Sequence, residues 1–173
     1  SHTIQTMGGL KSQVLAAFLP SAGATAMATD GKSLLEFSLK EAKALTQYPL
    51  PTRVAHAAAF NSDGSLLAVS RGREIHEYAT DSGTLIQTYE ADSGSAVGGG
   101  IQWTVAYHPS QPWLISGGSK AATIWDQKSA QRLAILETDA TLYIQTLACS
   151  NDGRRIAIVP SAAGQSIKVF RLD

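Results

Sequence analysis

The chain has 173 residues, of which 44% are hydrophobic and 16% charged, and its formal net charge is zero. This length suits one globular domain, and the balanced charge gives no reason to expect nucleic acid or an anionic membrane as the main partner. The single cysteine, Cys149, cannot form an internal disulfide. The sequence also shows no signal-peptide pattern and no apolar run that would span a bilayer. We therefore expect an intracellular, cytoplasmic protein.

Short β-rich runs separated by turn residues follow one another along the chain. The first run is a lone strand, cut off by two glycines, and consists of Thr3, Ile4, Gln5, Thr6 and Met7. Four units follow, at residues 12–48, 54–90, 101–137 and 143–171. The first three units have four expected strands each and the last has three. The surplus strand at the start and the missing strand at the end are complementary.

The expected strands take up most of each unit. They are 13–18, 24–29, 33–38 and 44–48; 54–60, 65–70, 73–79 and 84–90; 101–107, 112–117, 121–126 and 131–136; and 143–149, 155–159 and 166–171. Two sets of residues, one of alanines and one of aromatic residues, recur along the chain with the same period. The alanines at positions 17, 59, 106 and 148 are spaced by 42, 47 and 42 residues, and the aromatic residues at 37, 78, 125 and 170 by 41, 47 and 45.

A period of about 40 to 45 residues with four short strands per unit is typical of a β-propeller of the WD40 kind. Three stretches carry the resemblance: VAHAAAFNSDGSLLAVS at 54–70, TVAYHPSQPWLISGGS at 104–119, and the dipeptide Trp125-Asp126. On these stretches the chain resembles the WD40-repeat family over nearly its whole length. It departs from the family in lacking a Gly-His dipeptide before any strand and in having one Trp-Asp pair. We therefore expect the family's buried His-Ser/Thr-Asp-Trp hydrogen-bond network to be intact in no unit.

The resemblance implies an all-β fold of four WD40-like blades. Four blades in one closed ring would each subtend about 90°, whereas blades in rings of seven or eight subtend about 45 to 51°. We therefore predict a homodimer with eight blades, in which residues 3–7 of each chain complete the last blade of the other and remove its free edge. The alternatives are a closed four-bladed ring, a piece of a longer propeller, or pairing with a different chain.

No arrangement of residues in the sequence predicts catalysis. There is no Gly-x-Ser-x-Gly elbow for a nucleophile, and the four histidines have no metal-binding spacing. The glycine-rich stretch 94–100 is not followed by Gly-Lys-Ser/Thr and is interpreted as a connection between units. We expect no cofactor, no metal and no enzymatic activity.

The face of the disc where the innermost strands begin is the predicted binding surface, because WD40-like proteins generally bind partners there. Its candidate residues are Trp103, Arg71, Arg73, His56, Tyr143, Arg53, Gln102, Gln145, Lys120 and Lys32. Val14, His56, Trp103 and Gln145 are predicted to share one position around the channel mouth. Tryptophan and tyrosine beside arginine are typical of interaction hot spots. The leading hypothesis is a non-catalytic scaffold that binds a protein or peptide. The alternatives are an assembly module and, less favoured, a channel-based enzyme or small-molecule binder.

Overall fold

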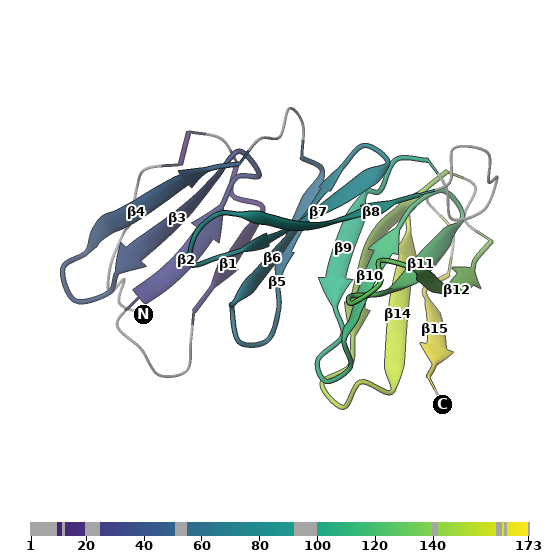
Figure 1. The fold of residues 1–173 in the computed structure, drawn as a ribbon. Helices are drawn as coiled ribbons and strands as arrows, with labels where there is room; N and C mark the ends of the chain where they lie inside the picture. The colour runs from purple at the N-terminus through teal and green to yellow at the C-terminus, as the bar shows by residue number, and fades with distance from the viewer. Residues whose placement is uncertain are drawn as a thin grey trace.

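The computed structural model describes residues 10–11, 13–19, 25–50, 55–91, 100–139, 142–161, 164 and 166–172. These residues form fifteen strands in four separate antiparallel sheets, each of which is one blade (Figure 1). In every blade the strands lie side by side in chain order. The predicted strand at residues 3–7 lies outside the described residues. No helix in the described part of the chain is long and apolar enough to cross a membrane.

The strands overlap the stretches expected for them. Blade 1 consists of β1 (Ala16–Phe18), β2 (Thr25–Thr29), β3 (Ser33–Ser38) and β4 (Lys43–Pro49). Blade 2 consists of β5 (Ala57–Phe60), β6 (Leu66–Arg71), β7 (Glu74–Ala79) and β8 (Leu85–Glu90). Blade 3 consists of β9 (Thr104–Tyr107), β10 (Trp113–Gly117), β11 (Ala121–Asp126) and β12 (Arg132–Glu137). Blade 4 consists of β13 (Ile144–Cys149), β14 (Arg155–Pro160) and β15 (Lys168–Arg171).

The turn between β5 and β6 shows how local sequence sets a hairpin and also joins two blades. Asp63 Oδ1 accepts a hydrogen bond from the backbone N–H of Ser65 at 2.8 Å. Gly64 has a φ of +76°, a conformation that glycine adopts without the steric cost of a Cβ. A Cβ at Gly64 would also overlap the ring of Phe18 from blade 1. This turn therefore needs glycine for its backbone and for its contact with the preceding blade.

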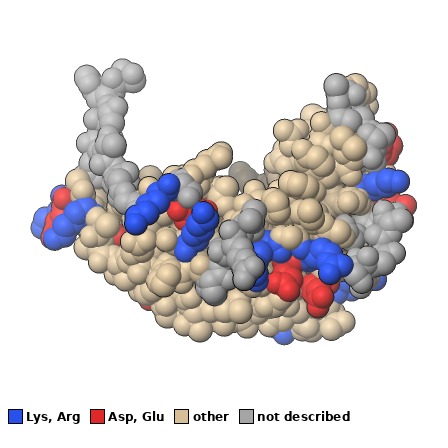
Figure 2. Space-filling view, turned by 90° about the horizontal axis from the view of Figure 1, so that it is seen from above, with Lys and Arg blue, Asp and Glu red and all other residues tan. Residues whose placement is uncertain are grey.

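The four blades follow one another along an open arc. The innermost strands β1, β5, β9 and β13 contact each other in this order. Blades 1 and 4 lie at opposite ends of the arc (Figure 1), and the space-filling view shows a crescent hollowed on one side (Figure 2). The structure therefore has the four predicted sheets, and the closed four-bladed ring is not observed.

An apolar core lies between each pair of successive blades. At each interface an aromatic residue of the third strand faces the preceding blade. Tyr78 packs with Leu34 and Leu67 between blades 1 and 2, and Trp125 packs with Ile75 and Tyr89 between blades 2 and 3. Between blades 3 and 4, Phe170 packs against a cluster that consists of Ile115, Ala122, Ile124, Ile144, Leu147, Ile156 and Ile158.

The interface between blades 2 and 3 also buries a carboxylate. Glu77 on β7 is only 2% exposed. Its Oε2 accepts a hydrogen bond from Tyr89 Oη at 2.9 Å, and its Oε1 accepts one from Tyr107 Oη and one from Gln127 Nε2, each at 2.9 Å. Burying a polar group costs free energy unless the group is hydrogen-bonded. These three donors therefore allow a glutamate to be buried at this position.

The register of β1 corrects one prediction. The structure pairs Phe18 with Met27, and this pair takes the place that Ala59–Ala68 has in blade 2. The backbone N–H of Leu15 accordingly donates to Thr29 O, as that of His56 donates to Ser70 O. Leu15, and not Val14, therefore shares the position of His56. The run of alanines in β1 offers no alternation of polar and apolar residues from which this one-residue shift could be predicted.

One part of the family's polar network is present in blade 3. Trp125 Nε1 donates a hydrogen bond to Ser116 Oγ at 2.9 Å, and both groups are buried. The nearby His108 bonds instead to the carbonyl of Gly153 and to the backbone N–H groups of Ser110 and Gln111. Among the described residues no histidine or aspartate extends the Trp125–Ser116 pair into the four-membered network.

Candidate functional site

Three aromatic side chains from three blades lie in contact where the innermost strands begin. We call His56, Trp103 and Tyr143 the aromatic strip. The ring centroids of His56 and Trp103 are 4.6 Å apart at an interplanar angle of 54°, and those of Trp103 and Tyr143 are 4.6 Å apart at 30°. All three side chains are half-buried. They form one continuous, partly exposed aromatic surface across blades 2, 3 and 4.

Backbone hydrogen bonds fix the strip on the rigid parts of the blades. The N–H of His56 donates to Ser70 O at 3.0 Å, and the N–H of Trp103 donates to Gly117 O at 2.8 Å. In blade 4 the carbonyl of Tyr143 accepts a hydrogen bond from the N–H of Ser161 at 3.0 Å. Each ring therefore projects from a residue bonded to the second strand of its own blade or to the residue that follows that strand.

A shift in the pairing of β13 explains why Tyr143 joins the strip and Gln145 does not. Ile144 pairs with Pro160 while Thr146 pairs with Val159, so Gln145 is an extra residue in the ladder. Such a bulge re-aims the side chains that precede it. Gln145 is exposed, and Tyr143 stacks on Trp103. The prediction that Gln145 shares the position of Trp103 is therefore wrong.

Gln102 lies directly before the strip and is fully buried. Its N–H donates to Gly72 O at 2.6 Å, which places it against the β6–β7 turn of blade 2, and its Nε2 donates to Gly100 O at 3.0 Å. Its Oε1 has no hydrogen-bond partner among the described residues. Gln102 thus connects two blades and does not belong to the exposed surface that was predicted for it.

Three of the predicted basic residues lie in the turns between the second and third strands, and Arg71 ends β6 beside one of these turns, at the same end of the blades as the strip. Lys32, Arg73 and Lys120 are exposed. Arg71 is half-buried, and its Nη1 lies 3.4 Å from Glu74 Oε2. Arg53 lies outside the described residues. The structure therefore brings one predicted cation, Arg71, into an ion pair and leaves three at the surface.

Arg71 is attached to a polar network that extends into the blade. Glu74 Oε2 lies 2.9 Å from His76 Nε2, and His76 Nδ1 lies 3.2 Å from the hydroxyl of Tyr78. All three alternate along β7 and face blade 1, because side chains two apart on a strand lie on the same face. Burial raises the pKa of Tyr78, so its hydroxyl remains protonated and available as a hydrogen-bond donor. This network positions Arg71 at the end of β6.

Two observations bear on the chemistry that the described residues can perform. The described residues contain no group of three or more His, Cys, Asp or Glu side chains that could hold a metal ion. Burial raises the pKa of the Cys149 thiol to about 11, so it is not a thiolate at neutral pH and is a poor nucleophile.

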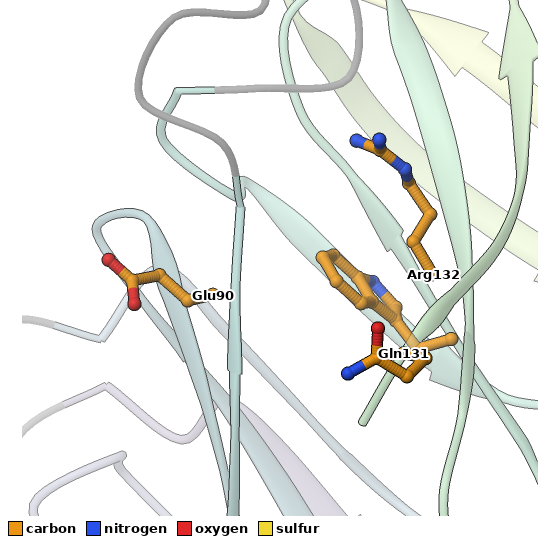
Figure 3. Close-up of a pocket in the computed structure, with 4 residues that line it drawn as sticks. Glu90, Gln131 and Arg132 are labelled. Carbon is orange, nitrogen blue, oxygen red and sulfur yellow. The ribbon is translucent and has the colours of Figure 1, made fainter. Parts of the chain in front are cut away.

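A pocket of about 230 Å³ lies away from the strip, between the outer strands of blades 2 and 3. It is lined by Glu90 of β8, Trp125 of β11, Gln131 and Arg132 of β12. Figure 3 shows Glu90 on one side and Gln131 and Arg132 on the other. Its residues come from the outer part of the blades, so it is separate from the surface around the inner strands.

Comparisons with known proteins agree with this architecture. Residues 83–126 match the model of the WD40 family (WD domain, G-beta repeat), a stretch that runs from the end of the β7–β8 turn to Asp126. No curated protein sequence matches the chain. Among solved structures, the chain is similar to the WD40 beta propeller domain of Doa1, with a TM-score of 0.73 and 14% sequence identity.

That likeness covers 91% of this chain and 51% of the Doa1 domain, so the chain spans about half the length of the structure it matches. At 14% identity the likeness concerns the fold. Taken with the repeat at residues 83–126, it shows that the chain is built from blades similar to those of WD40 β-propellers.

Proposed function

We propose that the chain is a non-catalytic interaction module that binds a protein or peptide on the end of the blades that carries the aromatic strip. WD40 propeller domains are typically protein-interaction scaffolds, and the family is generally non-catalytic. The aromatic strip is the observation that carries the proposal. Large rings held by a rigid scaffold lose little conformational entropy on binding and are enriched in interaction hot spots.

The strip also has the geometry of an anchor. Its three rings belong to three different blades, so a partner that covers it contacts a broad surface. The rings are half-buried and leave one side open, while their backbones are fixed by the sheets. Exposed lysine and arginine side chains in the neighbouring turns would add a charged rim.

The test is to measure partner capture with a variant of the strip. Trp103→Ala should abolish capture of partners from a cell extract, because Trp103 contacts both other rings. Leu133→Ala, on the outer strand β12, removes a side chain that is 52% exposed far from the strip and serves as the matched control. Circular dichroism should show that both variants are folded. Capture that is equal for Trp103→Ala and the unmodified chain would contradict the proposal.

A second function, assembly of a larger propeller, is favoured by the open face of blade 4. Val169 occupies the position of Ile124 in blade 3, since each precedes the aromatic residue paired with the second strand. Val169 is 63% exposed, whereas Ile124 is 4% exposed, and the neighbouring Ile167 is 62% exposed. Exposed apolar side chains at positions that other blades bury indicate a missing neighbour. We propose that a second copy supplies it and completes an eight-bladed homodimer through residues 3–7.

Light scattering after size exclusion tests the assembly. The dimer predicts a stable mass of twice 18.2 kDa. Val169→Lys should lower this mass to that of a monomer, because a charge would be buried in the contact, whereas Leu133→Lys should not change it. A stable mass of 18.2 kDa for the unmodified chain would contradict the proposed homodimer.

A further inference from the structure

Three cations occupy the same position in three successive blades. Lys32, Arg73 and Lys120 each lie two residues before a buried residue at the start of the third strand, namely Leu34, Ile75 and Ala122. Their carbonyl oxygens accept the same hydrogen bond from the residue that follows the outer strand: Leu50 N to Lys32 O at 2.7 Å, Ala91 N to Arg73 O at 3.0 Å, and Thr138 N to Lys120 O at 2.8 Å. We call these three residues the cation row.

No described residue neutralises the charges of the cation row. All three side chains are exposed, and none forms an ion pair with a described residue. Three other basic side chains are paired: Lys43 with Glu41 at 2.6 Å, Arg71 with Glu74 at 3.4 Å, and Lys168 with Asp139 at 3.0 Å. The row is therefore a set of regularly repeated positive charges that are free to meet anions from outside.

Blade 3 keeps its cation in an unfavourable backbone conformation. In blades 1 and 2 the positive φ of the turn falls on glycine, at Gly31 (+78°) and Gly72 (+60°), directly before the cation. In blade 3 it falls on Lys120 itself, with a φ of +62°. Glycine adopts this conformation more easily than any residue with a Cβ. The lysine side chain is therefore present where the backbone alone would favour glycine.

The surroundings of the row restrict where an anion can bind. On the inner side lies the aromatic strip, at the starts of β9 and the neighbouring innermost strands. On the outer side, β8 and β12 end at the exposed carboxylates of Glu90 and Glu137. Figure 2, which looks onto this end, shows acidic groups nearer to the convex edge than the basic groups beside them in the middle of the crescent. An anionic ligand is attracted to the row and repelled from the outer edge.

We propose that the partner is an extended acidic peptide segment, whose carboxylates meet the cation row and whose apolar or aromatic side chain packs on the aromatic strip. This proposal rests on the interaction function above and specifies its partner. An extended peptide can run along the row between the strip and the outer carboxylates. A nucleic acid fits less well, because its phosphates would also approach Glu90 and Glu137 and the chain has no net positive charge.

Fluorescence anisotropy on the full chain tests the proposal with synthetic probes. The main probe is a dye-labelled peptide in which glutamates flank a single phenylalanine, and its control has glutamine in place of every glutamate. We expect the acidic peptide to bind at least about tenfold more tightly at low salt, and its advantage to shrink as salt screens the charges. A labelled single-stranded oligonucleotide is the third probe. No binding of the acidic peptide, equal binding of the glutamine peptide, or tighter binding of the oligonucleotide would each overturn the proposal.

Two charge-reversal variants locate the site. Lys32→Glu, Arg73→Glu and Lys120→Glu together should weaken binding of the acidic peptide by about tenfold or more. The control combines Lys40→Glu, Lys128→Glu and Arg154→Glu, which change the net charge equally at the opposite end of the blades and should leave affinity within about twofold. Equal loss in both variants would show an effect of net charge only and contradict the site.

The two proposals can fail separately. If Trp103→Ala abolishes capture of natural partners while the acidic and glutamine peptides bind alike, the interaction function stands and the acidic partner is wrong. If the acidic peptide binds through the cation row but Trp103→Ala leaves capture unchanged, the charged site stands and the role of the strip in partner capture is wrong.

Discussion

The interface between blades 2 and 3 buries a charged side chain at the position where the interface between blades 3 and 4 buries an aliphatic one. Glu77 and Ile124 each precede the aromatic residue of the third strand, and both are buried, at 2% and 4% exposure. Glu77 accepts three hydrogen bonds, from Tyr89, Tyr107 and Gln127. Ile124 packs in a cluster of isoleucine, leucine and alanine side chains.

The difference shows what each solution requires. The apolar interface needs only complementary shape, and any well-fitting aliphatic set can supply it. The polar interface needs donors from β8, from β9 and from the turn after β11 to converge on one carboxylate. Two of these donors belong to blade 3, so Glu77 fixes the orientation of blade 3 relative to blade 2.

Placing a carboxylate in the apolar interface between blades 3 and 4 should have the largest effect on stability. Ile124→Glu places a carboxylate in the apolar cluster with no donor to receive it, and we expect a loss of more than about 4 kcal/mol in the free energy of unfolding. Urea denaturation followed by circular dichroism measures the loss. Ile124→Val, the control for size, should cost about 1 kcal/mol. Equal stability of the glutamate variant and the valine variant would show that this interface is not closed to solvent.

Removing the carboxylate of Glu77 should have the next largest effect. Glu77→Ala leaves two tyrosine hydroxyls and one amide without their acceptor and opens a cavity, so we expect a loss of about 3 kcal/mol in the free energy of unfolding. Glu77→Gln keeps one acceptor oxygen and should lose about half as much. The same denaturation experiment separates the two. An alanine variant as stable as the glutamine variant would mean that the three hydrogen bonds contribute nothing.

Alkaline pH should weaken the polar interface selectively. Burial, followed by the charge of Glu77 and the hydrogen bond to it, raises the pKa of both Tyr89 and Tyr107 above the ordinary value of 10.0. Because the folded state disfavours the phenolate, stability is fully present below pH 10 and falls as the pH rises further. Unfolding free energies measured across this range should decline less steeply in Tyr107→Phe, which has one such group fewer. An unchanged slope would contradict the assignment.

Loss of the tryptophan hydrogen bond in blade 3 should have the smallest effect. Ser116→Ala removes the acceptor of Trp125 Nε1 and leaves this buried N–H unpaired, at a cost of about 1 to 2 kcal/mol. Thermal denaturation of the variant measures this cost, and Ser119→Ala, at a half-buried position in the β10–β11 turn, is the control. A loss no greater than that of the control would show that aromatic packing alone holds Trp125.

The strands were predictable because each is a short β-rich run between turn residues, and the period gave four blades. The sequence also singled out the three residues of the aromatic strip. It did not predict their contact, because the stacking of Tyr143 on Trp103 depends on the bulge at Gln145, which has no marker in the sequence. Glu77 was missed for a related reason: a glutamate in a strand resembles a solvent-facing residue until its donors, 12 to 50 residues away, are brought to it.

The hydrogen bonds that hold the cation row have a consequence for how this surface can evolve. Each uses only the backbone carbonyl of Lys32, Arg73 or Lys120, a group that every amino acid has. Substitution at these three positions can therefore change or invert the charge of the face without removing a bond that supports the blade. Such a surface can acquire new partners by point mutation while its scaffold is left untouched.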